Sequence, residues 1–156
     1  MKKILALLCI TSMLFLISAC GTSPAKAGEM MQVVYENGDS WGDIEQMEDG
    51  RMVIDFEEGT VFLEITSQKS GEMIATGEMK IEKKEMDDVK KEIEKANFFA
   101  LSPETDEPLA QDGGYIRITV FAESGENSIY YPSYSKSIAD LEKVLQELYK
   151  KYEEML

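Results

Sequence analysis

Residues 49–66, which read DGRMVIDFEEGTVFLEIT, decide the fold class of this protein. Apolar and polar side chains alternate in Met52–Phe56 and in Thr60–Thr66, and a period of two is typical of strands with one buried face. Glu57-Glu58-Gly59 predicts a turn between these strands. Asp49-Gly50 predicts a two-residue hairpin turn before the first strand, because such turns require positive φ angles that glycine tolerates. The stretch therefore predicts antiparallel strand pairs.

The preceding and following sequence extends this pattern. Met30 to Tyr35 reads as a strand closed by Asn37-Gly38, and Asp43 to Met47 reads as the strand before the Asp49-Gly50 turn. A further strand is predicted at Glu72–Ile81. Residues 30–81 therefore predict an antiparallel meander of four or five strands.

The apolar period changes after residue 81. Apolar residues three or four positions apart predict an amphipathic helix over Glu82 to Asn97. Tyr115–Phe121 and Ser128–Tyr131 then read as a hairpin around a turn that contains Gly125. A last helix, with a capping box formed by Ser137 and Asp140, follows. Its apolar stripe consists of Ile138, Leu141, Val144, Leu145, Leu148 and Tyr152.

This order of elements predicts a single α+β domain at residues 30–156. We expect an antiparallel sheet, formed by the N-terminal meander plus the C-terminal hairpin, with two amphipathic helices packed on one face. Ile116, Ile118 and Val120 should face the helices. Their neighbours would then point to the opposite face: Tyr115, Arg117, Thr119 and Phe121.

The first 19 residues have the composition of an export signal. Lys2 and Lys3 precede an uncharged run from Ile4 to Ala19, and small residues close it before Cys20. The run has 16 residues, which is fewer than the ~20 that a membrane-spanning helix needs. We therefore expect a signal peptide at residues 1–19.

Ile17-Ser18-Ala19-Cys20 resembles the lipobox of bacterial lipoproteins, with Ile where Leu is commoner. The resemblance implies cleavage after Ala19 and acylation of Cys20, with chains such as palmitate, so that residues 20–29 form a lipidated tether. It also implies that the protein is attached to the extracytoplasmic face of a cell membrane. The rest of the chain is only loosely similar, over residues 80–152, to small envelope domains of unknown function, which implies no activity.

Composition and charge exclude several classes of protein. The chain has 156 residues and a formal charge of −14; without residues 1–19 it keeps 137 residues and all 30 acidic ones, and its charge is −16. Histidine is absent, and Cys20 is the only cysteine outside the signal peptide, which excludes disulfide scaffolds and thiolate metal clusters. We expect no cofactor and no nucleic-acid partner, because a strongly acidic chain repels phosphate backbones. Only Arg51 and Arg117 could bind a phosphate through two hydrogen bonds from one guanidinium group.

Aromatic residues around Arg117 predict a candidate binding surface, because Tyr, Trp and Arg dominate binding hot spots. The alternative is that these strand residues form a second buried face, covered by the N-terminal meander. The predicted surface consists of Tyr115, Arg117, Phe121, Tyr130 and Tyr134.

Other candidate sites have weaker patterns. Ser133 and Lys136 fit Ser-x-x-Lys before a helix, but the further motifs of penicillin-recognising enzymes are missing, and helix capping is the preferred interpretation of the pattern. Acidic residues could hold calcium, although neither candidate stretch has EF-hand spacing. The candidates are Glu36, Asp39 and Asp43 in the first stretch, and Glu104, Asp106, Glu107 and Asp112 in the second. We expect no metal site.

The leading prediction for function is a membrane-anchored, non-enzymatic lipoprotein that binds an unknown ligand or envelope protein. One alternative is an acidic inhibitor of a cationic envelope hydrolase such as lysozyme, because a strongly acidic domain is steered toward cationic partners. A further alternative is a small hydrolase that uses carboxylates alone.

Overall fold

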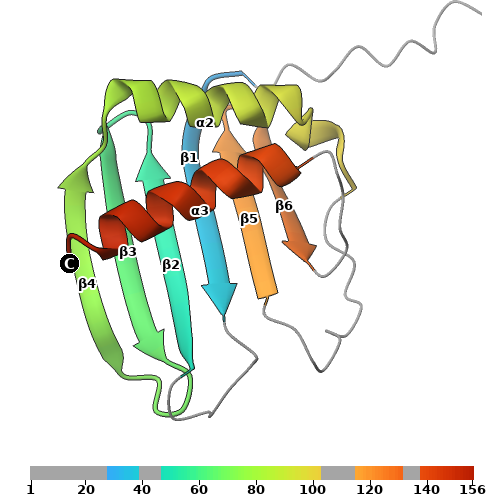
Figure 1. Cartoon of the computed structure of the whole chain (residues 1–156). Helices are drawn as coiled ribbons and strands as arrows, with labels where there is room; N and C mark the ends of the chain where they lie inside the picture. The colour runs from blue at the N-terminus through green and yellow to red at the C-terminus, as the bar shows by residue number, and fades with distance from the viewer. Residues whose placement is uncertain (1–27, 39–46, 103–114, 132–137) are drawn as a thin grey trace, which may run out of the picture.

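Six strands form one antiparallel sheet in the order β4-β3-β2-β1-β5-β6 (Figure 1). The computed structural model describes residues 28–38, 47–102, 115–131 and 138–156. The strands are β1 (Met30–Gly38), β2 (Glu48–Asp55), β3 (Thr60–Ser67), β4 (Met73–Lys80), β5 (Tyr115–Ala122) and β6 (Gly125–Tyr131). The helices are α2 (Lys83–Lys95), the short 3-10 helix η1 (Phe98–Ala100) and α3 (Ala139–Glu153). The expected α+β class, with an antiparallel sheet and two helices, is confirmed.

The first strand, β1, lies in the interior of the sheet and joins its two halves. It pairs antiparallel with β2 on one side and with β5 on the other, so that Val33 lies opposite both Ile54 and Val120. The N-terminal meander and the C-terminal hairpin are therefore parts of one layer. The alternative in which the meander covers a second face of the hairpin is wrong, because paired strands lie beside each other in one layer.

The two Gly-containing dipeptides predicted as hairpin turns lie inside strands instead. Asn37 pairs with Gly50, and Gly38 pairs with Asp49, within the ladder between β1 and β2. The two predicted turns are therefore wrong. The connection between these strands runs through residues 39–46, which lie outside the described residues together with most of the strand predicted at Asp43 to Met47.

Turn chemistry does explain the connection between β2 and β3. The Asp55 carboxylate accepts hydrogen bonds from the backbone N–H groups of Glu57 and Glu58 at 3.0 and 2.9 Å. Gly59 then adopts a φ of 63°, as a turn glycine can. The turn predicted at Glu57-Glu58-Gly59 is confirmed, whereas β6 begins at Gly125, three residues earlier than predicted.

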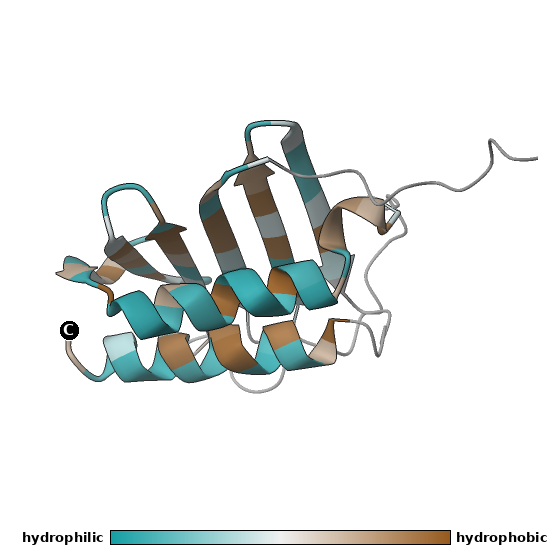
Figure 2. Ribbon diagram, turned by 90° about the horizontal axis from the view of Figure 1, so that it is seen from above, coloured by the Kyte–Doolittle hydropathy of each residue, from teal (hydrophilic) through white to brown (hydrophobic). Residues whose placement is uncertain are grey.

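Both helices lie side by side on the same side of the sheet (Figure 2). The core cluster joins sheet residues to helix residues, and its members are almost fully buried. It includes Val33, Tyr35, Met52, Ile54, Leu63, Ile118 and Val120 from the strands and Val89, Ile93, Leu141, Leu145 and Tyr152 from the helices. Ile118 and Val120 are buried as expected from the alternation in β5, and Ile116 packs against the same cluster.

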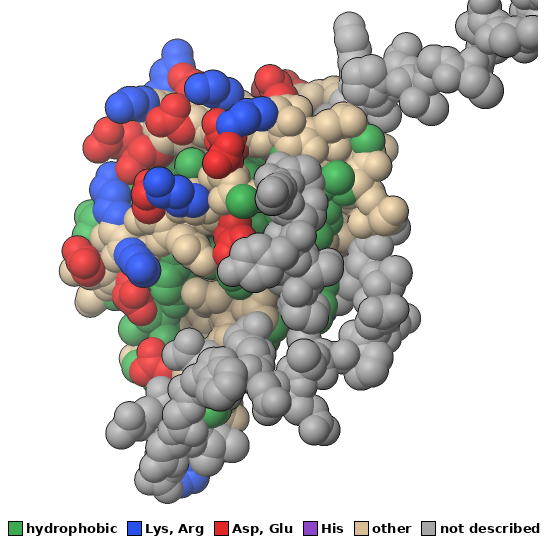
Figure 3. Space-filling view, turned by 45° about the vertical axis from the view of Figure 1, so that its right-hand side comes forward, with side chains coloured by type: hydrophobic (Ala, Val, Ile, Leu, Met, Phe, Trp, Pro, Cys, Tyr) green, Lys and Arg blue, Asp and Glu red, His purple; other side chains and the backbone are tan. Residues whose placement is uncertain are grey.

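The other face of the sheet is turned away from α2 and α3, and we call it the open face. It carries the side chains that alternate with the core residues along each strand. They are Gln32, Val34 and Glu36 on β1, Asp49, Arg51, Val53 and Asp55 on β2, Phe62 and Glu64 on β3, Tyr115, Arg117, Thr119 and Phe121 on β5, and Tyr130 on β6. On the opposite side, basic and acidic side chains are interspersed over the helices (Figure 3), which is the pattern of solvated helix faces.

The helix boundaries agree with the apolar periodicity to within a few residues. Helix α2 begins after Glu82, whose backbone N–H donates to the Glu85 carboxylate at 3.1 Å, and Asn97 follows it with a φ of 49°. Helix α3 begins at Ala139, and the Ser137 of its predicted capping box lies outside the described residues. Within the described part of the chain, no helix is both long and apolar enough to cross a membrane.

Two ion pairs join the antiparallel helices at opposite ends, and they differ in exposure. Lys95 and Asp140 meet at 2.5 Å with both side chains more than half exposed. Glu85 is mostly buried, and it accepts from the Lys151 ammonium at 2.6 Å and from the Tyr152 hydroxyl at 2.8 Å. Burial alone would raise the pKa of Glu85, but these hydrogen bonds outweigh it and lower the pKa. Only the Glu85 cluster should therefore contribute substantially to stability.

We predict that Glu85→Gln lowers the free energy of unfolding by about 1–2 kcal/mol at pH 7, because hydrogen bonds to a partly buried charge are lost. The folded-state pKa lies below the unfolded one, so this stability is present above about pH 4.5 and disappears as the pH falls through the folded pKa. Urea unfolding at pH 7 and pH 3 measures both effects. Asp140→Asn is the control and should leave the free energy of unfolding nearly unchanged, because the ion pair that it removes is exposed to solvent. Equal losses in both variants would contradict the prediction.

Candidate functional site

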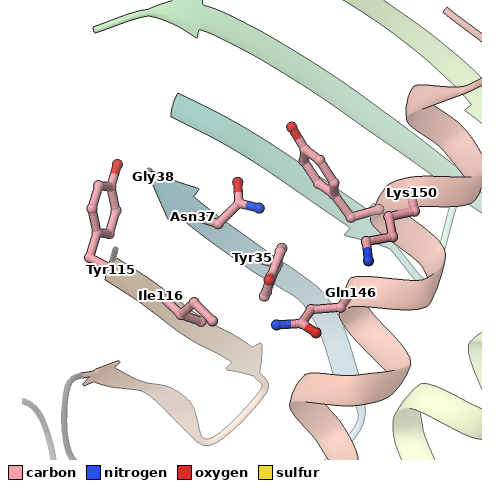
Figure 4. A pocket seen from close by; sticks show the side chains of 8 residues that line it. Tyr35, Asn37, Gly38, Tyr115, Ile116, Gln146 and Lys150 are labelled. Atoms are coloured by element: carbon pink, nitrogen blue, oxygen red, sulfur yellow. The ribbon is translucent and has the colours of Figure 1, made fainter. Parts of the chain in front are cut away.

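Two features of the described residues could bind a ligand, and Tyr115 belongs to both. The first is a cavity of about 330 Å³ where β1 ends and β5 begins, beside α3 (Figure 4). The second is the part of the open face that contains the predicted aromatic surface. The cavity is lined by Tyr35, Asn37, Gly38, Tyr115, Ile116, Gln146, Tyr149 and Lys150.

The cavity is lined by groups that hydrogen bond rather than by a reactive pair. Tyr35 is almost fully buried and lies 6.0 Å from Tyr149, measured between ring centroids. Burial raises the pKa of Tyr35 to about 12, although hydrogen bonds with Gln146 and Asn37 act in the opposite direction. The hydroxyl is therefore neutral at physiological pH. Gln146 also donates to the Glu142 carboxylate at 3.1 Å, and burial raises the pKa of that carboxyl.

The side chains around the cavity could recognise a polar group. Asn37, Gln146 and Lys150 offer hydrogen-bond donors and acceptors, and the described lining residues include no carboxylate or thiol. Across the described ranges, His, Cys, Asp and Glu do not gather in groups of three that could hold a metal.

On the open face, the structure brings together three of the predicted surface residues. The rings of Tyr115 and Tyr130 are stacked, with centroids 6.1 Å apart and planes inclined by 19°. The guanidinium carbon of Arg117 lies 5.2 Å from the Tyr130 centroid, within the range of a cation–π interaction. Phe121 lies four residues further along β5, opposite Gln32 of β1, and is not part of this cluster. Tyr134 lies outside the described residues.

The sequence analysis missed the carboxylate on which both arginines converge. Glu36 lies directly opposite Arg51 of β2 and Arg117 of β5 in the strand register. Its two carboxylate oxygens lie 3.7 Å from Arg51 Nε and from a terminal guanidinium nitrogen of Arg117. Glu64 lies opposite Arg51 on the next strand, so charges alternate across four strands. We call Glu36, Arg51, Arg117, Tyr115 and Tyr130 the Arg–Tyr cluster.

Glu36 had been considered as a calcium ligand together with Asp39 and Asp43. Both aspartates lie outside the described residues. The second candidate stretch, Glu104 to Asp112, also lies outside them, and so do Ser133 and Lys136 of the Ser-x-x-Lys pattern. Within the structure, Glu36 is instead held between two guanidinium groups. The alternation of the sequence could have placed Glu36 on this face, but the position of β1 between β2 and β5 could not be derived from it.

Hydrogen bonds fix Tyr115 in place. Its hydroxyl donates to the Asp49 carboxylate at 3.3 Å, and the Gln68 amide donates to the same oxygen at 2.8 Å. Burial, together with the neighbouring charge of Asp49, raises the pKa of Tyr115 to about 12. The phenol therefore stays neutral and keeps its hydrogen bond to Asp49. A ring held in this way loses little conformational entropy when a partner binds.

Gly50 explains why a Gly-containing dipeptide stands inside β2, beside the cavity. A Cβ atom at this position would overlap the Tyr149 hydroxyl of α3 and the Asn37 side chain of β1. The glycine therefore allows α3 to approach the sheet closely.

We predict that Gly50→Ala lowers the free energy of unfolding by about 1–3 kcal/mol, because the helix must shift to admit one methyl group. Gly77→Ala in β4 is the matched control: its nearest neighbour is the flexible Leu156 side chain at 2.5 Å. That variant should change the free energy of unfolding by no more than about 0.5 kcal/mol. Chemical denaturation of both variants checks this, and a neutral Gly50→Ala would show that Tyr149 is not constrained.

Comparison with known proteins assigns no family to this geometry. No protein-family model matches the chain. No curated protein matches its sequence. The function proposed below is therefore argued from the residues alone.

Proposed function

We propose that this protein is a lipid-anchored, non-enzymatic binding protein on the extracytoplasmic face of a bacterial cell membrane, and that its open face binds a protein partner. The observation that carries the proposal is the Arg–Tyr cluster, in which both arginines of the chain converge on Glu36 beside two stacked tyrosines. Tyrosine and arginine are the residues that most often dominate protein–protein binding energy.

The surroundings of the cluster favour a protein partner over a small molecule. Val53, Phe62 and Thr119 continue the open face beside the cluster, each partly exposed, and Val34 lies buried between them in the same register. Strands of one sheet present a broad surface, whereas small-molecule sites are concave and enclose most of the ligand. An apolar centre with charged groups beside it is the usual anatomy of a protein interface.

We further propose that α2 and α3 pack together on the core face and thereby leave the open face for the partner. The apolar residues of both helices belong to the same cluster as the sheet core, which supports this arrangement. The ion pairs between the helices hold them to each other on that side. Binding at the open face would then leave the core undisturbed.

The lipobox supports the proposed membrane attachment. After the tether, Glu29 accepts a hydrogen bond from the Glu123 backbone N–H at 3.1 Å, and the Glu123 carboxylate accepts from the Glu29 backbone N–H at 3.3 Å. These contacts hold the start of the domain at the turn between β5 and β6. A tether of residues 20–29 can reach at most about 30 Å when extended.

The acidic inhibitor remains an alternative proposal because it rests on the charge of −16 after removal of residues 1–19. It predicts a different dependence on the open face. Attraction of a lysozyme by net charge would change little on loss of one arginine, and that loss would make the protein still more acidic. Binding at the Arg–Tyr cluster would be weakened by the same change.

We predict that Cys20→Ala releases the protein from membranes and blocks cleavage after residue 19, because acylation of Cys20 both anchors the chain and precedes cleavage in bacterial lipoproteins. Membrane fractionation and intact-mass measurement of the full chain test this. Ser18→Ala is the control and should leave both membrane anchoring and cleavage after residue 19 intact. Retention of the Cys20→Ala protein in the membrane at unchanged mass would refute the lipid anchor.

We predict that a photo-crosslinking residue at Thr119, on the open face, captures one dominant partner in intact membranes, and that the same residue at Lys143, on α3, does not. Arg117→Ala should weaken binding of the purified partner about 30-fold or more, as expected for a hot-spot residue. Lys143→Ala is the control and should leave affinity unchanged.

Affinity that is equal for Arg117→Ala and the unmodified protein would overturn the assignment of the Arg–Tyr cluster. Parallel titration with lysozyme at low salt separates the alternative. Tight binding of lysozyme that Arg117→Ala does not weaken would favour the acidic inhibitor.

A further inference from the structure

Tyr35, which lines the cavity beside α3, differs in its contacts from the two other described tyrosines whose pKa is raised to about 12. The Tyr152 hydroxyl donates to the Glu85 carboxylate at 2.8 Å, and the Tyr115 hydroxyl donates to the Asp49 carboxylate at 3.3 Å. Tyr35 is as deeply buried as Tyr152, since each is 1% exposed. Within the described part of the chain, however, no residue accepts a hydrogen bond from the Tyr35 hydroxyl.

The side-chain amides of Gln146 and Asn37 donate to the Tyr35 oxygen instead. Their hydrogen bonds lower the pKa of Tyr35, as expected when a donor stabilises the phenolate. The carboxylate of Glu85, which accepts from Tyr152, acts on that tyrosine in the opposite direction. Figure 4 shows the side chains of Tyr35 and Gln146 pointing toward one another across the cavity. The hydrogen of the Tyr35 hydroxyl is therefore left for an acceptor that enters the cavity.

The amide of Gln146 adds the complementary requirement. One carboxamide has two N–H donors, and those of Gln146 are used by the Glu142 carboxylate at 3.1 Å and by Tyr35. Its carbonyl oxygen is left to accept a hydrogen bond. A ligand group that contacts both side chains must accept from Tyr35 and donate to Gln146. A hydroxyl group does both, whereas a carboxylate or phosphate oxygen only accepts.

The size and walls of the cavity favour one small molecule that carries several hydroxyl groups. Its volume of about 330 Å³ lies near the lower end of the range for ligand sites, which is roughly 300–1,000 Å³. Asn37 offers a second carboxamide on the floor formed by β1, and Tyr149 and Ile116 supply aromatic and aliphatic walls. A sugar ring matches these walls, because its hydroxyl groups lie around its edge and its C–H groups form an apolar face.

Charges around the cavity favour a neutral ligand. Lys150 is exposed and is the charged side chain among the described lining residues, so it opposes a cation. Two carboxylates stand behind the lining, since Glu142 contacts Gln146 and Asp49 contacts Tyr115. The chain also carries a charge of −16 without residues 1–19, which repels anions at longer range.

We propose that this cavity binds one neutral sugar unit, which is either a free monosaccharide or the end of a glycan chain. The Tyr35 hydroxyl donates to a sugar hydroxyl, and that hydroxyl donates to the carbonyl oxygen of Gln146. The remaining N–H and carbonyl groups of Asn37 pair with further hydroxyls of the ring. This sugar site goes beyond the proposed partner binding at the open face, and the two share only Tyr115.

Titration of the purified full chain with sugars tests the proposal. The probes are glucose, galactose, mannose and N-acetylglucosamine, and the chain is kept in a detergent that has no sugar head group. Isothermal calorimetry should show that at least one of the four binds with a Kd of about 1 mM or tighter. Glucuronate, which carries a carboxylate on the ring of glucose, should bind more weakly than glucose.

Tyr35→Phe keeps the ring and removes only the hydroxyl. It should weaken binding of the sugar about fivefold or more, because one hydrogen bond to the ligand is lost. Tyr152→Phe is the matched control: it removes an equally buried hydroxyl that does not line the cavity, and it should leave the affinity unchanged. Gln146→Ala, on a half-buried position of α3, should weaken binding by a similar factor and provides a second test that leaves β1 unaltered.

The disaccharide of the sugar that binds distinguishes the two sources. Binding at least as tight as that of the monosaccharide identifies the end of a glycan, and weaker binding identifies the free monosaccharide; both agree with the proposed site.

Three outcomes would overturn the proposal. None of the four sugars binds, or glucuronate binds more tightly than glucose, or Tyr35→Phe and Gln146→Ala bind the sugar as well as Tyr152→Phe does. None of these measurements uses the Arg117→Ala variant or the protein partner, so the sugar site can fail while the proposed partner binding stands.

Discussion

The rest of the structure depends on the pairing of β1 with two strands that come from opposite parts of the sequence. β1 pairs with β2 through a nearby connection and with β5 across about 80 residues of chain. Val33 and Tyr35 become almost fully buried only because strands flank β1 on both sides and the helices lie over it. Without this strand, the meander and the hairpin would be two small sheets, each with an additional open edge.

The same pairing creates the Arg–Tyr cluster. Arg51 and Arg117 are 66 positions apart in the sequence, and the position of Glu36 between them brings both guanidinium groups to one carboxylate. Stacking of Tyr115 on Tyr130 and the hydrogen bond to Asp49 then order the aromatic side of the cluster. A surface ordered before binding can use more of its contact energy for affinity. The stacking, the hydrogen bond and the ion pairs all hold side chains of the cluster in place, which fits the proposed binding of a partner.

The two edge strands of the sheet, β6 and β4, differ in the side chains that they carry and in what these contact. At β6 the buried amide of Asn127 donates to the Phe98 and Leu101 carbonyls and so ties the chain around η1 to the sheet; Asn127 is the one buried polar side chain among the described residues. At β4, Met73 and Ile74 are exposed next to the charged residues Glu78 and Lys80, and the strand has a bulge between Met73 and Ala75. Charges and bulges are features that limit pairing at the edge of a sheet.

The sequence by itself determined the local elements, because alternation and helical periodicity depend on near neighbours. It predicted the Glu57-Glu58-Gly59 turn, both helices, and the buried positions Ile118 and Val120 of β5. It failed at Asp49-Gly50 and Asn37-Gly38, where glycine is required by the approach of Tyr149 and other side chains and not by a turn. It also left open whether the aromatic residues of β5 form a surface or a second core.

Only the tertiary structure shows that the meander does not cover the aromatic face of β5, because the sequence pattern of β5 does not reveal which strands lie beside it. The position of β1 puts meander and hairpin in one layer, so the meander cannot cover the aromatic face. It also determines which charges meet, since cross-strand partners follow from register rather than from distance along the chain. The resemblance to a lipobox depends on four consecutive residues, so the sequence alone is enough to suggest it.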